Sequence, residues 1–226
     1  MLQQQTLAKP ASFSGTGLHS GNKVSMTLLP APPNTGILFR RVDLESRAEI
    51  PAQVEHVSET SRSTTLSRGK AKVQTVEHVL ASLSGFGLTN VIVEVDANEP
   101  PIADGSSRQF CRMINDAGIE VQAEKLAPIS ITEPIEYTHG ETVMNAFPHD
   151  GFKITCTSAD KGGRFTQFFS VELTPETWER EIAHARTFCF YEEIEFLIKN
   201  GLIRGGSLEN AIVIREDAVL TTEPMR

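Results

Sequence analysis

The chain has 226 residues, of which 39% are hydrophobic and 22% charged, and its formal net charge is −8. This is enough apolar sequence for one large domain or two small ones. The negative charge argues against a nucleic-acid partner. Apolar runs are no longer than strands, so no transmembrane segment is expected, and no secretory leader is visible. Three widely spaced cysteines indicate reduced thiols and a cytoplasmic protein without a structural zinc knuckle.

The first half of the chain predicts strands interrupted by helices. Its glycine-rich stretch at residues 13–21 is expected to be a turn region. It does not fit a dinucleotide-binding loop, because such a loop leads into a helix and here a strand follows. Strands are expected at residues 24–29, 37–42 and 90–96, and a helix at residues 108–117 that is capped by the preceding Asp-Gly-Ser-Ser and ended by Gly118.

The stretch of residues 75–90 predicts an amphipathic helix that begins with an acid beside a histidine and is ended by Gly85 and Gly87. Thr75 is the expected N-cap, and Glu77 suits the positive end of the helix dipole. A carboxylate beside an imidazole at a helix start is typical of metal-assisted hydrolysis, with His78 as the ligand and Glu77 as the proton carrier. The alternative is a solvated helix edge, and the pair alone leaves that alternative open.

The second half predicts more strands and two further helices. Thr174 is the expected N-cap of a helix at residues 174–183, with a proline at its first position. Both halves contain a methionine four residues before a proline, which is what a duplicated domain leaves behind, although chance spacing is the alternative. The remaining expected elements are strands at residues 152–156, 211–214 and 218–220 and a helix at residues 192–199.

We therefore predict an α+β fold of two domains with similar topology, each a β-sheet packed with helices. The first domain is expected to span residues 1–125 and to carry the Glu-His helix. The second is expected to span residues 126–226 and to be incomplete at its C-terminus.

Several segments, in order along essentially the whole chain, resemble the zinc-dependent UDP-3-O-acyl-N-acetylglucosamine deacetylases of Gram-negative bacteria. These enzymes commit the pathway to lipid A. The segments that carry the resemblance are residues 15–21, 75–78, 101–106, 185–188 and 201–213, together with Asn90 and its strand.

The resemblance implies a site between the two halves. His78 matches a zinc ligand, Glu77 matches the general base, and Thr187 matches a threonine that helps to hold the developing oxyanion. Without the resemblance, Thr187 could simply bond a backbone carbonyl, and the nearby aromatic and glycine residues could be core and turn. The residues expected to contact the acylated UDP-N-acetylglucosamine substrate are Leu18 near the entrance, Phe188, and the acyl-passage residues Phe190, Ile194, Ile203, Gly206, Ser207, Asn210 and Val213.

The zinc ligands are where the chain departs from the family. The family's other two ligands, on a His-Lys-x-x-Asp helix, and its general-acid histidine lie beyond the point where this chain ends. His139, His149 and His184 have no aspartate at the helical spacing that would replace them. Because a catalytic zinc takes three protein ligands, His78 alone would be insufficient.

The main hypothesis is a zinc-dependent amidohydrolase that releases acetate from the substrate's acetamide. One alternative is a non-catalytic fragment or paralogue that binds substrate without a complete zinc site. Another is an interaction module of the same fold. Because the family's second core continues past this chain, exposed apolar surface or a loose packing is expected in the second half.

Overall fold

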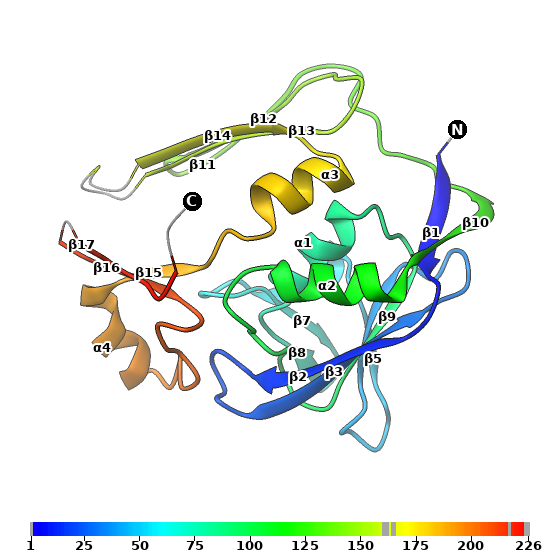
Figure 1. Cartoon of the computed structure of the whole chain (residues 1–226). Helices are drawn as coiled ribbons and strands as arrows, with labels where there is room; N and C mark the ends of the chain where they lie inside the picture. Colours follow the sequence, from blue (N-terminus) through cyan, green and yellow to red (C-terminus); the bar gives the residue numbers. More distant parts are fainter. Residues whose placement is uncertain (1, 160–162, 164–165, 217, 224–226) are drawn as a thin grey trace.

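A computed structural model of the chain describes residues 2–159, 163, 166–216 and 218–223. Helices and several β-sheets alternate along the chain, which confirms the expected α+β class (Figure 1). The division into domains at residues 1–125 and 126–226 stays a prediction.

A five-stranded sheet in the order β2–β3–β9–β4–β5 is the foundation of the first part of the chain. Its central strand β9 pairs antiparallel with β3 and parallel with β4. Along β9, Val91, Val93 and Val95 are fully buried and the residues between them are not, as the alternation of side chains in a strand requires. The strands are β2 (Ala11–Thr16), β3 (Lys23–Pro30), β9 (Val91–Val95), β4 (Ile37–Arg41) and β5 (Glu49–Pro51).

Two helices contribute to the same core as this sheet. Helix α1 spans Glu77–Gly85, and α2 spans Arg108–Ala117 with Gly118 at its C-cap, as predicted. Phe110 and Ile114 of α2 are buried in the cluster that holds the inward side chains of the sheet. The smaller elements nearby are β6 (Val57–Glu59), β7 (Thr65–Arg68) and β8 (Ala71–Val73), the short 3-10 helix η1 (Val54–His56), and the pair β1 (Gln3–Leu7) with β10 (Ile119–Lys125).

Two local expectations for this part were wrong. Thr75 is not the N-cap of α1: Val76 holds that position, and Thr75 precedes it in a left-handed conformation at φ 57°. The N-cap residue of α1 therefore makes no side-chain capping hydrogen bond. The turn region at residues 13–21 is also shorter than predicted, because β2 runs to Thr16 and pairs with β3.

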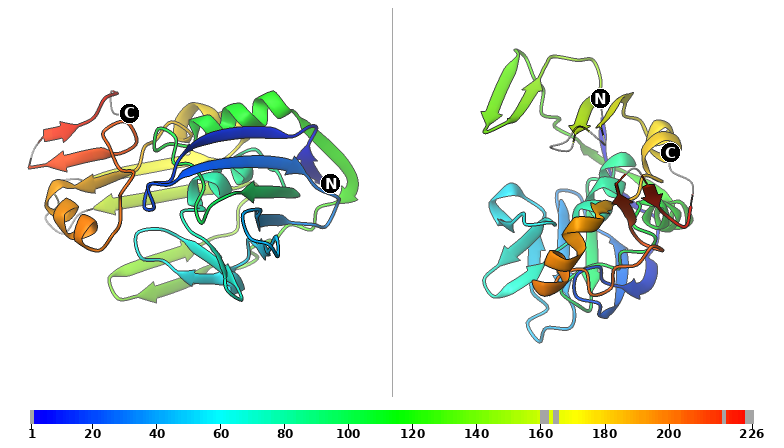
Figure 2. Two further views of the ribbon diagram at one scale, coloured as in Figure 1. Left: turned by 90° about the horizontal axis from the view of Figure 1, so that it is seen from below. Right: turned by 90° about the vertical axis from the view of Figure 1, so that its left-hand side faces the viewer.

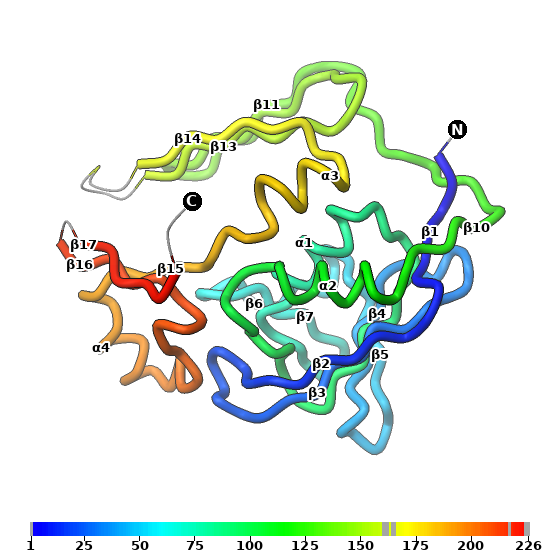
Figure 3. Tube along the Cα trace, viewed as in Figure 1, coloured from blue at the N-terminus to red at the C-terminus, as the bar shows by residue number. Residues whose placement is uncertain are grey.

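The second half contains two hairpins and a small three-stranded sheet. In the sheet, β15 lies parallel to β16, and β16 is antiparallel to β17. Figure 3 traces the chain from the hairpins to this sheet. The elements are β11 (Ile135–His139) with β12 (Thr142–Ala146), β13 (Lys153–Ala159) with β14 (Thr166–Glu172), and β15 (Phe188–Phe190), α4 (Tyr191–Lys199), β16 (Ile212–Arg215) and β17 (Ala218–Leu220).

The hairpins carry the exposed apolar surface that the sequence predicts for the second half. Tyr137 is 60% exposed, Phe147 63% and Phe168 69%. In Figure 1 both hairpins lie across α1 and α2 from the five-stranded sheet, and the right-hand view of Figure 2 places β11 and β12 at the edge of the molecule. The main hydrophobic core therefore belongs to the first part of the chain.

Trp178 anchors the second half to that core. The cap expected at Thr174 is confirmed, but the helix is regular only over α3 (Pro175–Thr177) and continues as a π-helical turn, η2 (Trp178–Ile182). Trp178 is 6% exposed, and its indole N–H donates to Cys111 Sγ at 3.3 Å. A β-carbon at Gly85 would overlap this ring, so α1 meets it through a residue without a side chain.

Replacing Trp178 with alanine should lower the free energy of unfolding by about 3–5 kcal/mol, because a buried ring leaves a cavity. The matched control Phe168→Ala removes an exposed ring and should change it by less than about 0.5 kcal/mol. Urea unfolding followed by circular dichroism measures both. Equal losses for the two variants would contradict the anchoring role of Trp178.

Candidate functional site

The acid expected as general base is fixed at the start of α1. Glu77 is the first residue of the helix, and its Oε2 accepts a hydrogen bond from the Thr64 backbone N–H at 3.0 Å. Thr64 ends the loop between β6 and β7, so this loop determines where the carboxylate points.

His78 follows Glu77 and is partly buried. Burial lowers the pKa of its imidazole, and the neighbouring carboxylates of Glu77 and Asp104 oppose this only in part. Burial therefore favours the neutral imidazole, which is the form that can bind a metal ion.

The loop at residues 101–107, which leads into α2, contacts both His78 and Thr187. The Ser107 hydroxyl donates to the His78 backbone carbonyl at 3.2 Å. Two residues earlier, the Gly105 carbonyl accepts from the Thr187 backbone N–H at 2.8 Å. One short loop thus brings the histidine of the first half and the threonine of the second half to the same region.

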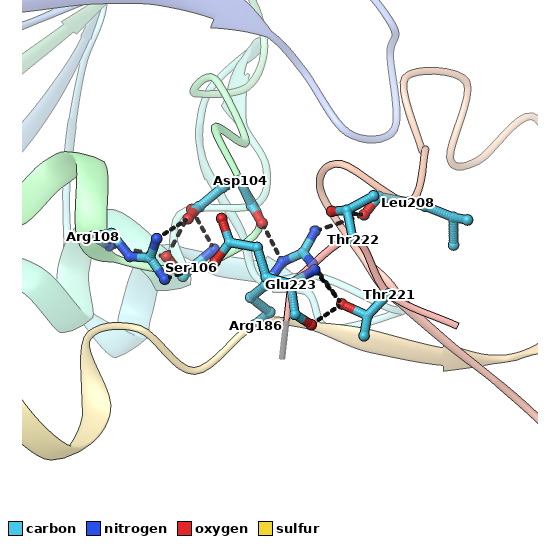
Figure 4. A network of polar contacts seen from close by, with 8 residues as sticks. All are labelled: Asp104, Ser106, Arg108, Arg186, Leu208, Thr221, Thr222 and Glu223. Atoms are coloured by element: carbon cyan, nitrogen blue, oxygen red, sulfur yellow. Dashed lines mark hydrogen bonds and ion pairs between the residues drawn. The ribbon is translucent and has the colours of Figure 1, made fainter. Parts of the chain in front are cut away.

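Arg186 strengthens this junction (Figure 4). Its Nε donates to the Asp104 carbonyl at 2.7 Å, and its Nη2 donates to the Leu208 carbonyl at 2.9 Å. The third contact runs from Nη1 to Thr221 Oγ1 at 3.0 Å. The guanidinium therefore ties the 101–107 loop to the segment that returns toward β16.

Leu18, expected near the site entrance, lies against the segment that is expected to line the acyl passage. Its carbonyl accepts from the Gly205 N–H at 3.0 Å. Within the segment, Gly206 donates to the Ile203 carbonyl at 2.9 Å, and Ser207 donates from its backbone to Asn210 Oδ1 at 2.9 Å. These bonds make the loop between α4 and β16 compact.

The other expected passage residues lie on the small sheet and its helix. Phe188 and Phe190 pack edge to face in β15, with ring centroids 5.9 Å apart. Val213 lies on β16 in register with Cys189, and Ile194 lies on α4. The structure therefore places these residues on adjacent elements.

An ion pair connects helix α4, which carries the expected passage residue Ile194, to the loop that holds Glu77. Arg62 donates to both carboxylate oxygens of Glu193, one at 3.2 Å, and this bonding lowers the pKa of the Glu193 carboxyl. Arg62 lies two residues before Thr64. The loop between β6 and β7 thus contacts elements from both halves of the candidate site.

The described residues fit one ligand position of a zinc site and do not complete it. Among them, no group of three or more His, Cys, Asp or Glu side chains is placed to hold a metal ion. His78 is suitable as a single ligand. Another imidazole, that of the buried His19, has no hydrogen-bond partner for Nε2 within the described part of the chain.

No described helix is long and apolar enough to cross a membrane.

Residues 4–226 match the family model described as "LpxC: UDP-3-O-acyl N-acetylglycosamine deacetylase". The chain belongs to this family. Curated relatives from Idiomarina loihiensis, Anaeromyxobacter dehalogenans and Chlamydia abortus are each named UDP-3-O-acyl-N-acetylglucosamine deacetylase. They are 42%, 45% and 43% identical to this chain. The alignments cover 100%, 99% and 99% of it, and 75%, 72% and 80% of the relatives.

Asp104 and Arg186 contribute to this candidate site, although the sequence gave them no role. Both lie in segments that carry the family resemblance, residues 101–106 and 185–188. Their place in these two segments was the only signal in the sequence that pointed to them. Their roles rest largely on bonds to backbone carbonyls, for which the sequence gives no local pattern.

The cysteines of this LpxC-family chain should differ in reactivity. Burial raises the pKa of the Cys111 and Cys189 thiols, whereas Cys156 is exposed on β13. A raised pKa leaves less reactive thiolate at a given pH. Iodoacetamide at pH 7.5 should therefore modify Cys156 first and the buried Cys111 last, as followed by peptide mass spectrometry. Faster labelling of Cys111 would contradict this description of the core.

Proposed function

We propose that this protein hydrolyses the acetamide of UDP-3-O-acyl-N-acetylglucosamine, releasing acetate, in lipid A biosynthesis. Membership of the LpxC family supports the reaction class. The observation that carries the proposal is the 101–107 loop, which hydrogen-bonds to His78 on one side and to Thr187 on the other. The expected location in the cytoplasm of a Gram-negative bacterium stays part of the proposal.

In this proposal Glu77 takes a proton from the attacking water. Its Oε2 is already bonded to the Thr64 amide, which leaves the other carboxylate oxygen to accept the proton. The hydrogen bond holds the carboxylate in one orientation before substrate binds. A protonated group must then donate a proton to the sugar amine so that the amine can leave.

Thr187 would stabilise the negative charge that develops on the acetamide oxygen. Its N–H and C=O are both used, by Gly105 and by Ile212 at 2.9 Å. No hydrogen bond involves its hydroxyl among the described residues, so the hydroxyl is available to donate to substrate. Fixing the backbone on both sides places this donor before the reaction, which is how oxyanion stabilisation is most effective.

We further propose zinc (Zn2+) as the cofactor, with His78 as one ligand. When bound, zinc would act as a Lewis acid and lower the pKa of water. The remaining ligands would lie outside the described residues. Burial of His78, which favours its neutral form, supports this part of the proposal.

The acyl chain would pass over the apolar side chains of β15, α4 and β16. Phe188 is 42% exposed and Phe190 is partly exposed, so both rings have surface left for a ligand. Val213 lies on the neighbouring strand. This arrangement supports a hydrophobic passage rather than a polar sugar pocket at this place.

Replacing Glu77 with glutamine should lower kcat by about 10²–10⁴-fold, because a general base is lost. Thr187→Val should lower kcat by about 10²–10³-fold, because an oxyanion donor is lost. Acetate release from acylated UDP-N-acetylglucosamine measures both, and metal analysis should show unchanged zinc in these two variants and less zinc in His78→Ala.

Glu94→Gln is the matched control, since Glu94 pairs with Arg40 and Arg47 on the central sheet and should not affect the chemistry. If Glu77→Gln kept nearly full turnover, Glu77 would not be the base. A wild-type protein that binds the substrate but releases no acetate would favour the non-catalytic alternative.

A further inference from the structure

Glu99 is a fully buried carboxylate to which the mechanism above gives no role. It is 0% exposed and lies just after β9. Its Oε1 accepts from the His19 backbone N–H at 2.8 Å, and its Oε2 accepts from the Ser20 N–H at 2.9 Å and from Gln74 Nε2 at 2.8 Å. Burying a carboxylate is costly unless such donors replace water.

The turn at residues 17–21 is shaped around this carboxylate. The Gly21 N–H donates to the Gly17 carbonyl at 3.1 Å and closes the turn. A β-carbon at Gly17 would come within 2.6 Å of Glu99 Cδ, so the backbone itself packs on the carboxyl group. Two consecutive backbone amides, those of His19 and Ser20, thus donate to the two carboxyl oxygens of Glu99.

The opposite side of the same turn holds the acyl-passage segment. The His19 carbonyl accepts from the Arg204 N–H at 3.3 Å, and His19 Nδ1 accepts from the Ile203 N–H at 3.4 Å. Leu18 accepts from Gly205, and a β-carbon at Gly205 would overlap the Gly17 carbonyl oxygen. Backbone therefore meets backbone at Gly17 and Gly205, and the His19 ring adds one side-chain contact beside them.

These contacts form a continuous chain from Glu99 to the passage. The peptide group between Leu18 and His19 donates its N–H to Glu99 and accepts at its carbonyl from Gly205. The next peptide group, between His19 and Ser20, likewise donates to Glu99 and accepts from Arg204. If the carboxylate no longer holds the His19 and Ser20 amides, the turn can shift. The segment bonded to its other side must then shift with it.

We propose that Glu99 is a positioning residue that fixes the 17–21 turn and, through it, the 203–206 segment that lines the acyl passage. Its consequence for the substrate rests on the proposed function, because the passage is part of that proposal. Glu99 would thus contribute to selection of the acyl chain without touching the reacting atoms.

The first test does not depend on activity. Glu99→Gln keeps the side-chain shape but turns one acceptor oxygen into an N–H donor that faces a donor. Hydrogen exchange in peptides covering residues 17–21 and 202–206 should rise by about tenfold, the size expected for losing one hydrogen bond. Exchange in β9 should stay unchanged. The control Glu94→Gln should leave both peptides as in the wild type, and unchanged exchange at residues 202–206 in Glu99→Gln would overturn the proposal.

The second test separates positioning from general damage. In Glu99→Gln, KM for a long-chain acyl substrate should rise about tenfold and more than KM for a short-chain analogue, with little change in kcat. A merely destabilised protein would lose turnover equally with both substrates, and that result would also contradict the proposal. A wild-type protein without deacetylase activity would refute the proposed function, while the exchange result would still decide the role of Glu99.

Discussion

Gly105 lies so close to Asn210 that a β-carbon at its position would overlap the Asn210 carbonyl oxygen. Its φ of 81° is a left-handed conformation that suits glycine, and its own carbonyl accepts from Thr187. The contact seats the segment of residues 183–213 directly on the loop that leads into α2. The candidate site depends on this contact, because Glu77 and His78 come from one side of it and Thr187 from the other.

The two sides are stabilised in different ways. The first part has a large core in which Phe39, Phe110 and Ile114 are almost fully buried. The second half is attached through the Trp178 anchor and a series of backbone hydrogen bonds, while its hairpins leave apolar side chains exposed. Regions with few buried apolar contacts open more easily than a core does. The position of Thr187 and of the proposed acyl passage therefore depends on docking onto the first part, with Gly105 and the proposed positioning residue Glu99 as two points of that docking.

The sequence predicted the elements whose signals are local. The alternation along β9, the glycine stop of α2 and the cap at Thr174 depend on neighbouring residues, and the structure confirms them. The prediction of Thr75 as the N-cap of α1 was wrong because the backbone at Thr75 is in a left-handed conformation. The parallel pairing of β15 with β16 and the π-helical turn were not foreseen, because long-range contacts determine them.

The candidate site, like the fold, could be predicted only where its signals are local in the sequence. The adjacent acid and histidine of α1 suggested metal-assisted hydrolysis from the sequence alone, but only the family resemblance favoured those roles over a solvated helix edge, and the roles stay proposals. Asp104, Arg186 and Glu99 could not be found from spacing, since their roles depend largely on backbone atoms that folding brings near. A sequence displays the chemistry of a side chain but not which carbonyl or amide it will meet.

The most direct test of the account is hydrogen exchange in Gly105→Ala. The added methyl group should push the 207–213 segment away and raise exchange at the Thr187 and Ile212 amides, with β9 still protected. Gly69→Ala is the matched control, because Gly69 also has positive φ but nothing within 4 Å of an added β-carbon. Its Thr187 and Ile212 amides should exchange as in the wild type. If these amides stayed equally protected in Gly105→Ala, the loop would not be what holds the two sides of the site together.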